Sequence, residues 1–272
     1  MASYPLALTI AGSDSGGCAG IQADIKTFSS LGVFSASVIT AITAQNTLGV
    51  IDVMAVPSNF VEKQLKAVLE DFEFGVIKIG MLFTKENVFA IKKLYKNNIP
   101  LVLDPVMIST SGNSLILDQT IESIIKELFP ISTIITPNLN ETSILLKREI
   151  KTLNQMIDGA NDFINKYGVN SVLIKGGHLN GGEMVDVFQI KGNREAILLK
   201  SNKIETINTH GTGCTLSSAI AAYLAIGKDL ETSVRMGKEY ITEAILKGKD
   251  VKLGNGHGAV NHFFNPQKLI KI

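Results

Sequence analysis

A glycine-rich turn in the second half of the chain carries the strongest chemical signal of the sequence, Thr209-His210-Gly211-Thr212-Gly213-Cys214. Its glycines would let backbone amides approach a ligand closely, and an apolar stretch with helical spacing follows it directly. The first turn of a helix leaves N–H groups unpaired and carries partial positive charge. Because a phosphoryl group in transfer spreads negative charge over its oxygens, donors fixed here would stabilise its transition state. Neither Gly-Lys-Ser nor Gly-Lys-Thr occurs, so this is not a Walker A loop, and glycines that only pack a helix start are the alternative.

Two carboxylates could hold the magnesium ion that phosphoryl transfer from ATP requires. Asp104 directly follows a short apolar run, and Glu141 lies three residues after Asn138. Magnesium is usually bound by one or two carboxylates together with phosphates and waters. The spacing of Asn138 and Glu141 is also that of a helix capping box, and Asp104 could belong to an ordinary turn. Both explanations stay open for each residue.

A single lysine, Lys175, stands between the apolar run Val172–Ile174 and two glycines. An ammonium group at the end of a buried strand would be well placed to contact a phosphate. A lysine in a surface loop would have a similar sequence. We favour the phosphate contact, because the flanking residues are apolar on one side and glycine on the other.

Short apolar runs alternate with longer amphipathic segments along most of the chain. The predicted strands are Leu6–Ala11, Val38–Ala44, Val50–Val56, Val76–Ile79, Leu101–Leu103, Thr133–Ile135, Val172–Ile174, Met184–Ile190 and Ala196–Leu199. The predicted helices are Cys18–Leu31, one capped by Ser58, Lys85–Lys96, Gln119–Phe129, one beginning at Asn138, Leu153–Tyr167, Thr212–Ile226 and Leu230–Leu246. The alternation predicts a mostly parallel sheet covered on both faces, with a hairpin in its last two strands. Without a linker or a repeat, the pattern predicts a single domain over residues 1–272.

Ligands bind at the carboxyl ends of the strands in sheets of this kind. The residues least expected in a core fall at these ends, namely Gly12-Ser13-Asp14, Gln45-Asn46, Gly80-Met81, Asp104-Pro105, Pro137-Asn138 and Lys175-Gly176-Gly177. The candidate chemistry and the expected binding edge therefore coincide.

Composition excludes several function classes. The chain has 26 Lys and Arg against 25 Asp and Glu, so charge gives no reason to expect nucleic acid or an anionic membrane as a partner. Its two cysteines, Cys18 and Cys214, make no disulfide scaffold and do not have zinc-type spacing. Polar residues interrupt the uncharged stretches 27–51 and 206–227, which a bilayer core would penalise. No basic leader precedes the first apolar run, so we expect a cytoplasmic protein without a membrane segment.

Eight segments in order give the sequence its family resemblance. They are Ala11–Gly17, Gly20–Asp24, Thr43–Thr47, Lys78–Leu82, Asp104–Met107, Thr136–Asn138, Lys175–His178 and His210–Cys214. Together they resemble the ribokinase-like superfamily, and most closely its hydroxymethylpyrimidine and phosphomethylpyrimidine kinases of thiamine biosynthesis. The resemblance extends from Leu8 to about Phe264.

This resemblance implies a fold, an activity and partners. The fold is a ribokinase-like three-layer α/β/α sandwich, often paired into homodimers. The activity is the ATP-dependent phosphorylation of 4-amino-5-hydroxymethyl-2-methylpyrimidine to its monophosphate and then to the diphosphate in one site. ATP and Mg²⁺ are the implied cofactors, and a monovalent cation is a further candidate.

The resemblance also implies roles for individual residues. The pyrimidine would bind Gln45, since a carboxamide offers an acceptor and donors to an exocyclic amine beside a ring nitrogen. Met81 and Val106 would form apolar walls for the ring or only pack in the core, Gly12 would also bind the substrate, and Asp24 would face the hydroxymethyl group or the solvent. The remaining implied roles are nucleotide and phosphate binding by Gly211, Thr212, Gly213, Lys175 and Asn138, catalysis by Cys214, Gly211, Gly213 and Lys175, and metal binding by Asp104 and Glu141.

Cys214 occupies the position where sugar kinases of the superfamily have an aspartate base. A helix N-terminus lowers the pKa of a thiol, whereas bound phosphates oppose this effect. A loose transition state has little need of a strong base, so positioning of the hydroxymethyl group, deprotonation of it, and mere packing of a small side chain all remain possible roles. The chain departs from the branch at Cys18, where the glycine run usually continues. The segment Ser109–Leu117 is predicted to be a flap that closes over the substrate.

Two other functions are compatible with the sequence. Some members of the branch phosphorylate pyridoxal, and those most like that group can carry a cysteine on the flap; residues 107–112 have none, which favours the pyrimidine. A ligand-binding protein that kept the fold without catalysis is the second alternative. The intact glycine turn, Lys175, Asp104 and Glu141 argue against it.

Overall fold

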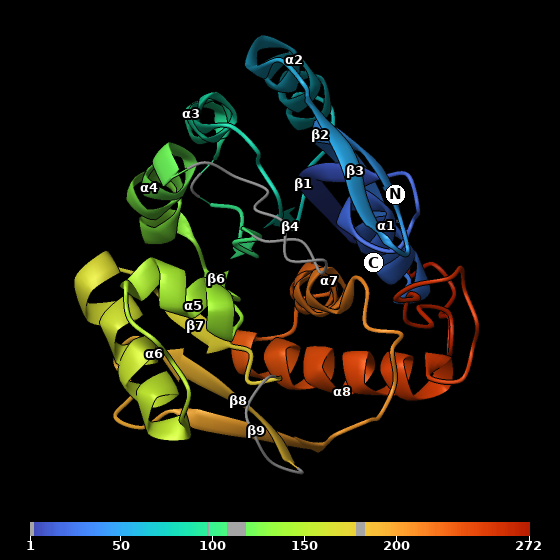
Figure 1. Cartoon of the computed structure of the whole chain (residues 1–272). Coiled ribbons are helices and arrows are strands. Elements are labelled where there is room, and N and C mark those ends of the chain that lie inside the picture. Colours follow the sequence, from blue (N-terminus) through green and yellow to red (C-terminus); the bar gives the residue numbers. More distant parts are fainter. Residues whose placement is uncertain (1–2, 97, 108–117, 178–182) are drawn as a thin grey trace.

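The computed structural model describes residues 3–96, 98–107, 118–177 and 183–272. Nine strands form one sheet in the order β3-β2-β1-β4-β5-β6-β7-β8-β9 (Figure 1). The strands are β1 Leu6–Asp14, β2 Phe34–Asn46, β3 Gly49–Ala55, β4 Val76–Ile79, β5 Leu101–Leu103, β6 Ile134–Ile135, β7 Ser171–Ile174, β8 Glu183–Ile190 and β9 Ile197–Asn202. Strands β2, β1 and β4 to β7 run parallel, while β3, β8 and β9 are antiparallel to their neighbours.

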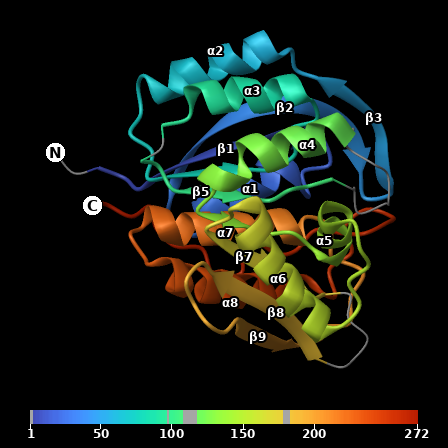
Figure 2. The same ribbon diagram turned by 90° about the vertical axis from the view of Figure 1, so that its left-hand side faces the viewer.

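Helices cover both faces of the sheet, as the three-layer prediction requires. They are α1 Gly20–Ser30, α2 Ser58–Leu69, α3 Lys85–Leu94, α4 Asp118–Glu127, the 3₁₀ turn η1 Phe129–Ile131, α5 Leu139–Leu146, α6 Leu153–Tyr167, α7 Thr212–Ala225 and α8 Leu230–Gly248. Helices α2 to α6 lie on one face, and α1, α7 and α8 lie on the other (Figures 1 and 2). Two apolar clusters fill the spaces between the layers, one on each side of the sheet. Among the described residues, no helix is both long and apolar enough to cross a membrane.

The chain reverses its direction of travel across the sheet at β1. After β1 it crosses to β2 on one side, and after β3 it returns to β4 on the other side of β1. A crevice opens at the carboxyl ends of the strands at such a reversal. The topology therefore places the binding site beside the end of β1, over β4 and β5.

The local sequence explains where most elements begin and end. Residues of β4, β5, β6 and β7 are all buried, as expected for short apolar runs covered on both faces. Capping boxes begin α5 at Asn138 and α6 at Thr152. The predicted helices and strands are all present, with ends that shift by a few residues. One prediction is wrong: Ser58 is the first helical residue of α2, and Pro57 occupies the cap position without a side-chain bond. The predicted flap Ser109–Leu117 lies entirely outside the described residues, which resume at Asp118 with α4.

Candidate active site

A cavity of about 480 Å³ opens at the carboxyl ends of the parallel strands. Residues at or just after the ends of β1, β2, β4, β5, β6 and β7 line it, and so do the first turn of α7 and one face of α8. Every predicted site residue except Asp24 is among the lining residues. The structure therefore gathers side chains that are far apart in the sequence into one cavity.

The glycine turn begins α7 as the sequence predicts. Gly211 is the N-cap and has a φ of 80°, a left-handed conformation that favours glycine. The backbone of Cys18 also packs so close to Gly211 that a Cβ would clash with its carbonyl. At Gly213, a Cβ would lie 3.2 Å from Lys175 Nζ and 3.5 Å from Asp104 Oδ2. Glycine thus keeps open the space between the helix N-terminus and these charged groups.

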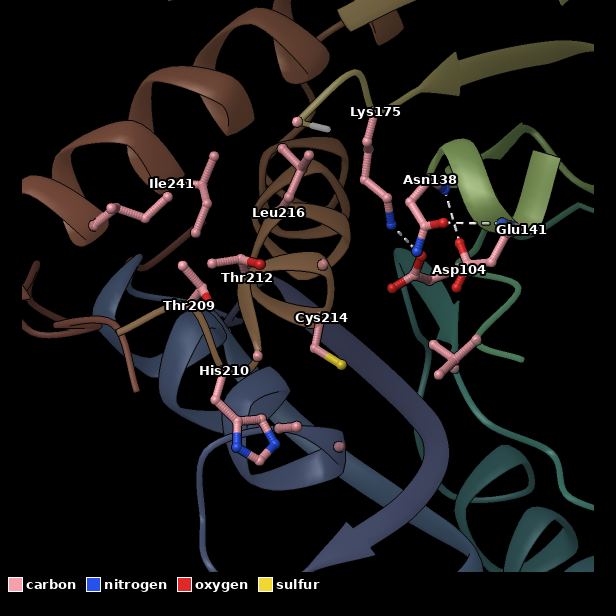
Figure 3. Close-up of a pocket in the computed structure, with 18 of the residues that line it drawn as sticks. Asp104, Asn138, Glu141, Lys175, Thr209, His210, Thr212, Cys214, Leu216 and Ile241 are labelled. Carbon is pink, nitrogen blue, oxygen red and sulfur yellow. Dashed lines mark hydrogen bonds and ion pairs between the residues drawn. The ribbon is translucent and has the colours of Figure 1, made fainter. Parts of the chain in front are cut away.

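Lys175 and Asp104 form an ion pair at this helix terminus (Figure 3). Lys175 Nζ lies 2.8 Å from Asp104 Oδ1, which also accepts a 3.0 Å hydrogen bond from Thr136 Oγ1. Burial would raise the pKa of Asp104, but the Lys175 and Lys78 ammonium groups outweigh burial and hold this pKa below its ordinary value. Burial would lower the pKa of Lys175, but Asp104 and Glu141 raise it above its ordinary value. Both groups are therefore charged at neutral pH.

Glu141 has the structural role that its spacing suggested. The Asn138 N–H donates to Glu141 Oε2 at 2.7 Å, and the Glu141 N–H donates to Asn138 Oδ1 at 2.9 Å, which closes the capping box (Figure 3). Burial, together with the nearby Asp104 carboxylate, raises the pKa of Glu141 to about 7, although Lys175 opposes the shift. A carboxyl group in this state is poised to ionise when a cation arrives.

The residues fit a magnesium ion only together with phosphate oxygens. Within the described part of the chain, no group of three or more His, Cys, Asp or Glu side chains could hold a metal. Asp104 and Glu141 supply two carboxylates beside the space that Gly213 leaves open. This donor set suits Mg²⁺, which commonly takes one or two carboxylates plus substrate phosphates.

Cys214 lies in the first turn of α7 and projects into the centre of the cavity (Figure 3). Burial raises the pKa of its thiol to about 11, although the Lys78 ammonium opposes the shift. At about neutral pH, only on the order of one molecule in 10⁴ would carry a thiolate. The protein without ligands therefore presents a thiol here, not a ready base.

Gln45 lies at the end of β2 and is held on both sides. Its Nε2 is 2.8 Å from His210 Nε2, and its Oε1 is 3.1 Å from Thr43 Oγ1. The His210 ring is buried, and burial lowers its pKa although the nearby Asp14 carboxylate opposes the shift. Gln45 thus presents an oriented carboxamide at the cavity wall, and its binding of a pyrimidine stays a prediction.

Two apolar side chains, the buried Met81 and the half-buried Val106, line the cavity after β4 and β5. Gly12 lies opposite Met81, and a Cβ at this position would clash with the Met81 methyl group. Gly12 therefore makes room for the methionine side chain.

Asp24 does not occupy the predicted position. Its carboxylate is fully buried between α1 and the sheet, where it is 2.8 Å from Lys78 Nζ and accepts hydrogen bonds from Thr9 Oγ1 and Ser218 Oγ. Asp24 does not line the cavity, although Lys78 does. The prediction that Asp24 faces the substrate is thus corrected: a lysine in a buried strand requires a countercharge, and Asp24 supplies it.

Sequence reasoning missed functional candidates at the other end of the cavity. Asp186 in β8 accepts a 2.8 Å hydrogen bond from the Gly176 N–H and lies 2.7 Å from Lys238 Nζ in α8. Apolar side chains line the same end, including Leu216 and Ile241 (Figure 3). In the sequence, this buried pair was indicated only by a lone aspartate within the apolar run of β8. The contact of His210 with Gln45 was indicated by nothing beyond the place of His210 in the glycine turn.

This chain is similar in sequence and in structure to known kinases of one family and its relatives. The sequence matches the phosphomethylpyrimidine kinase family over residues 14–261. It is 46% identical over 259 residues to the hydroxymethylpyrimidine/phosphomethylpyrimidine kinase of Rhizobium meliloti (strain 1021), covering 95% of this chain and 97% of that protein. The solved phosphomethylpyrimidine kinase of Clostridium difficile 630 is 44% identical, with a TM-score of 0.76 over 88% of this chain and 99% of that one. A Bacillus subtilis pyridoxal kinase, solved as an ADP complex, is 36% identical, with a TM-score of 0.85 over 96% of this chain and 98% of that one.

Proposed function

Because the chain belongs to the phosphomethylpyrimidine kinase family, we propose that it phosphorylates 4-amino-5-hydroxymethyl-2-methylpyrimidine with ATP, first to the monophosphate and then to the diphosphate. One observation carries this proposal: the N-terminus of α7, with glycine at positions 211 and 213, faces the Lys175–Asp104 pair across an open space. Backbone donors and an ammonium group there suit the charge that develops on a phosphoryl group in transfer.

Each end of the cavity has a role in this proposal. Gln45, Met81 and Val106 would bind the pyrimidine, while the apolar end near Ile241 would receive the adenine of ATP. The amides of the α7 turn and Lys175 would bind the phosphates, with Asn138 beside them. Asp104 and Glu141 would hold Mg²⁺, which neutralises phosphate charge when bound.

Cys214 is proposed to position the acceptor rather than to remove its proton. A thiol with a pKa near 11 can donate its S–H but is a thiolate in very few molecules. In the second phosphorylation the acceptor is an ionised phosphate oxygen, so that step requires no base at all. Positioning by Cys214 would serve both steps in the same cavity.

The proposal extends to the domain organisation, assembly, location and ion requirement of the protein. We propose that residues 1–272 form one kinase domain, since a single sheet joins strands from Leu6 to Asn202. We also propose a homodimer in which copies pack through β2 and β3, where the paired residues Ile42 and Met54 are 44% and 62% exposed. A cytoplasmic location and a requirement for a monovalent cation complete the proposal. Light scattering tests the dimer. Replacement of K⁺ by a bulky organic cation in the activity assay tests the cation requirement.

A coupled assay of ADP release with the pyrimidine tests the proposed function. Turnover that requires both the pyrimidine and Mg²⁺ is expected; ligand binding without turnover would instead identify a non-catalytic binding protein. Pyridoxal is the second candidate substrate, because the pyridoxal kinase of Bacillus subtilis has a similar structure. Competition at equal concentrations gives the ratio of kcat/KM values, which we expect to favour the pyrimidine.

A further inference from the structure

Phosphoryl transfer does not explain the position of His210. The residue is only 5% exposed, and its Nε2 lies 2.8 Å from Gln45 Nε2. His210 and the Lys175–Asp104 pair lie on opposite sides of Cys214 (Figure 3). We propose that His210 is a positioning residue that fixes which end of the Gln45 carboxamide donates and which accepts. The site then selects an exocyclic amine next to a ring nitrogen, an inference that rests on the proposed binding of the pyrimidine by Gln45.

Thr43 does not fix the orientation of this carboxamide. Its Oγ1 lies 3.1 Å from Gln45 Oε1 and 3.0 Å from the Ser13 carbonyl oxygen, but a hydroxyl has one proton. Thr43 can donate to Gln45 Oε1. It can equally donate to the Ser13 carbonyl and accept from the amide nitrogen of a flipped Gln45. Thr43 is therefore compatible with both orientations.

His210 distinguishes the two orientations, because a neutral imidazole nitrogen either donates or accepts. The Gln45 atom that lies 2.8 Å from His210 Nε2 is the amide nitrogen, which can only donate. In a neutral His210 ring, Nε2 is therefore the acceptor and the proton is on Nδ1. Oε1 of Gln45 then faces Thr43, 3.1 Å from its Oγ1.

Asp14 does not draw the proton to the other nitrogen. Its Oδ2 lies 4.0 Å from His210 Nε2, which is beyond hydrogen-bond distance. Three backbone amides already donate to the Asp14 carboxylate, those of Gly16, Cys18 and Ala19, at 2.8 to 2.9 Å. The carboxylate is therefore satisfied without His210.

The consequence is a fixed order of donor and acceptor on the Gln45 edge that faces the ligand. One lone pair of Oε1 can accept from an exocyclic amine, and the second amide N–H can donate to a ring nitrogen. A 4-oxopyrimidine presents the reverse order, a carbonyl beside a ring N–H. Without the Nε2 acceptor, the carboxamide could rotate and serve either ligand.

Substrate preference is the property to measure. The kcat/KM ratio for the 4-aminopyrimidine over its 4-oxo analogue should fall roughly tenfold in His210→Leu, mainly through a higher KM for the amine. The matched control is His262→Leu, because His262 is also buried but bonds Thr215 instead of Gln45. The control should keep the preference of the unaltered protein. His210→Gln, which can still accept a hydrogen bond, should recover part of it.

The outcomes separate this inference from the proposed function. No turnover of the amine by the unaltered protein would overturn the proposed function and the inference with it. Normal turnover with an undiminished preference in His210→Leu would overturn the inference alone. If His210→Leu fails to fold, ¹⁵N NMR of the unaltered protein decides: a protonated Nδ1 with a bare Nε2 supports the inference, and a protonated Nε2 overturns it.

Discussion

Removing the charge of Asp24 separates a structural role for this residue from a role in substrate binding. Asp24→Asn keeps the shape of the side chain and leaves the Lys78 ammonium buried without a countercharge. In the native structure Lys78 Nζ lies 2.8 Å and 2.9 Å from the two carboxylate oxygens, and neither side chain is exposed. Burial would lower the pKa of Lys78, but Asp24 raises it above its ordinary value. The variant removes the group that keeps this lysine charged.

The expected loss of stability is large. Removing one partner of a buried ion pair costs about 3–5 kcal/mol, because the other charge stays buried alone. For a protein of this size, that loss lowers the unfolding midpoint by roughly 10 °C. Replacing both charges in Asp24→Asn/Lys78→Met should restore most of the stability, since an uncharged pair of similar volume carries no such penalty.

Thermal unfolding followed by circular dichroism measures this loss, and steady-state kinetics measures KM for the pyrimidine. Asp24→Asn should unfold at a much lower temperature with KM changed only a few-fold, and the double variant should regain the midpoint. An unchanged midpoint together with a large rise in KM would contradict a purely structural role for Asp24. Such a result would mean that the Asp24 carboxylate meets the substrate after all.

Three further predictions concern the cavity itself. Gly213→Ala places a methyl group 3.2 Å from Lys175 Nζ and should lower kcat by about 10²-fold or more without loss of stability; a normal kcat would contradict the anion site. Cys214→Ala should keep kcat within about tenfold, because its thiol is not ionised near neutral pH; a loss of kcat far beyond tenfold would restore the base role. Glu141, with its pKa raised to about 7, favours the folded state below its unfolded pKa and loses that contribution as the pH rises through about 7; the midpoint of the ligand-free protein should therefore fall between about pH 5 and pH 8, and Glu141→Gln should fall less.

Periodicity predicted most of the fold because burial on both faces leaves a clear trace. Strands such as β4 and β7 are short runs of apolar residues between amphipathic helices, and their bounds follow from the change in period. The direction of β3 was harder to predict from the sequence, because its residues are half exposed and pair with β2 in an antiparallel hairpin.

The sequence placed those site residues in the cavity that stand directly beside the predicted end of a helix or strand. Gly211 and Gly213 precede a helix, and Lys175 follows a buried strand, so each had a local reason to be noticed. Asp24 was misplaced because its partner Lys78 is 54 residues away. A charged residue inside the apolar run of β4 requires a buried partner, but the sequence does not say which one.

One cavity is expected to transfer phosphoryl groups from ATP to the hydroxymethylpyrimidine twice. Mass spectrometry of the reaction mixture over time follows both transfers. The monophosphate should appear first and then give way to the diphosphate, and Gly213→Ala should slow both steps together, because both would use the same anion site. ADP release without any phosphorylated pyrimidine, or a Gly213→Ala variant that forms both products at the normal rate, would contradict the account.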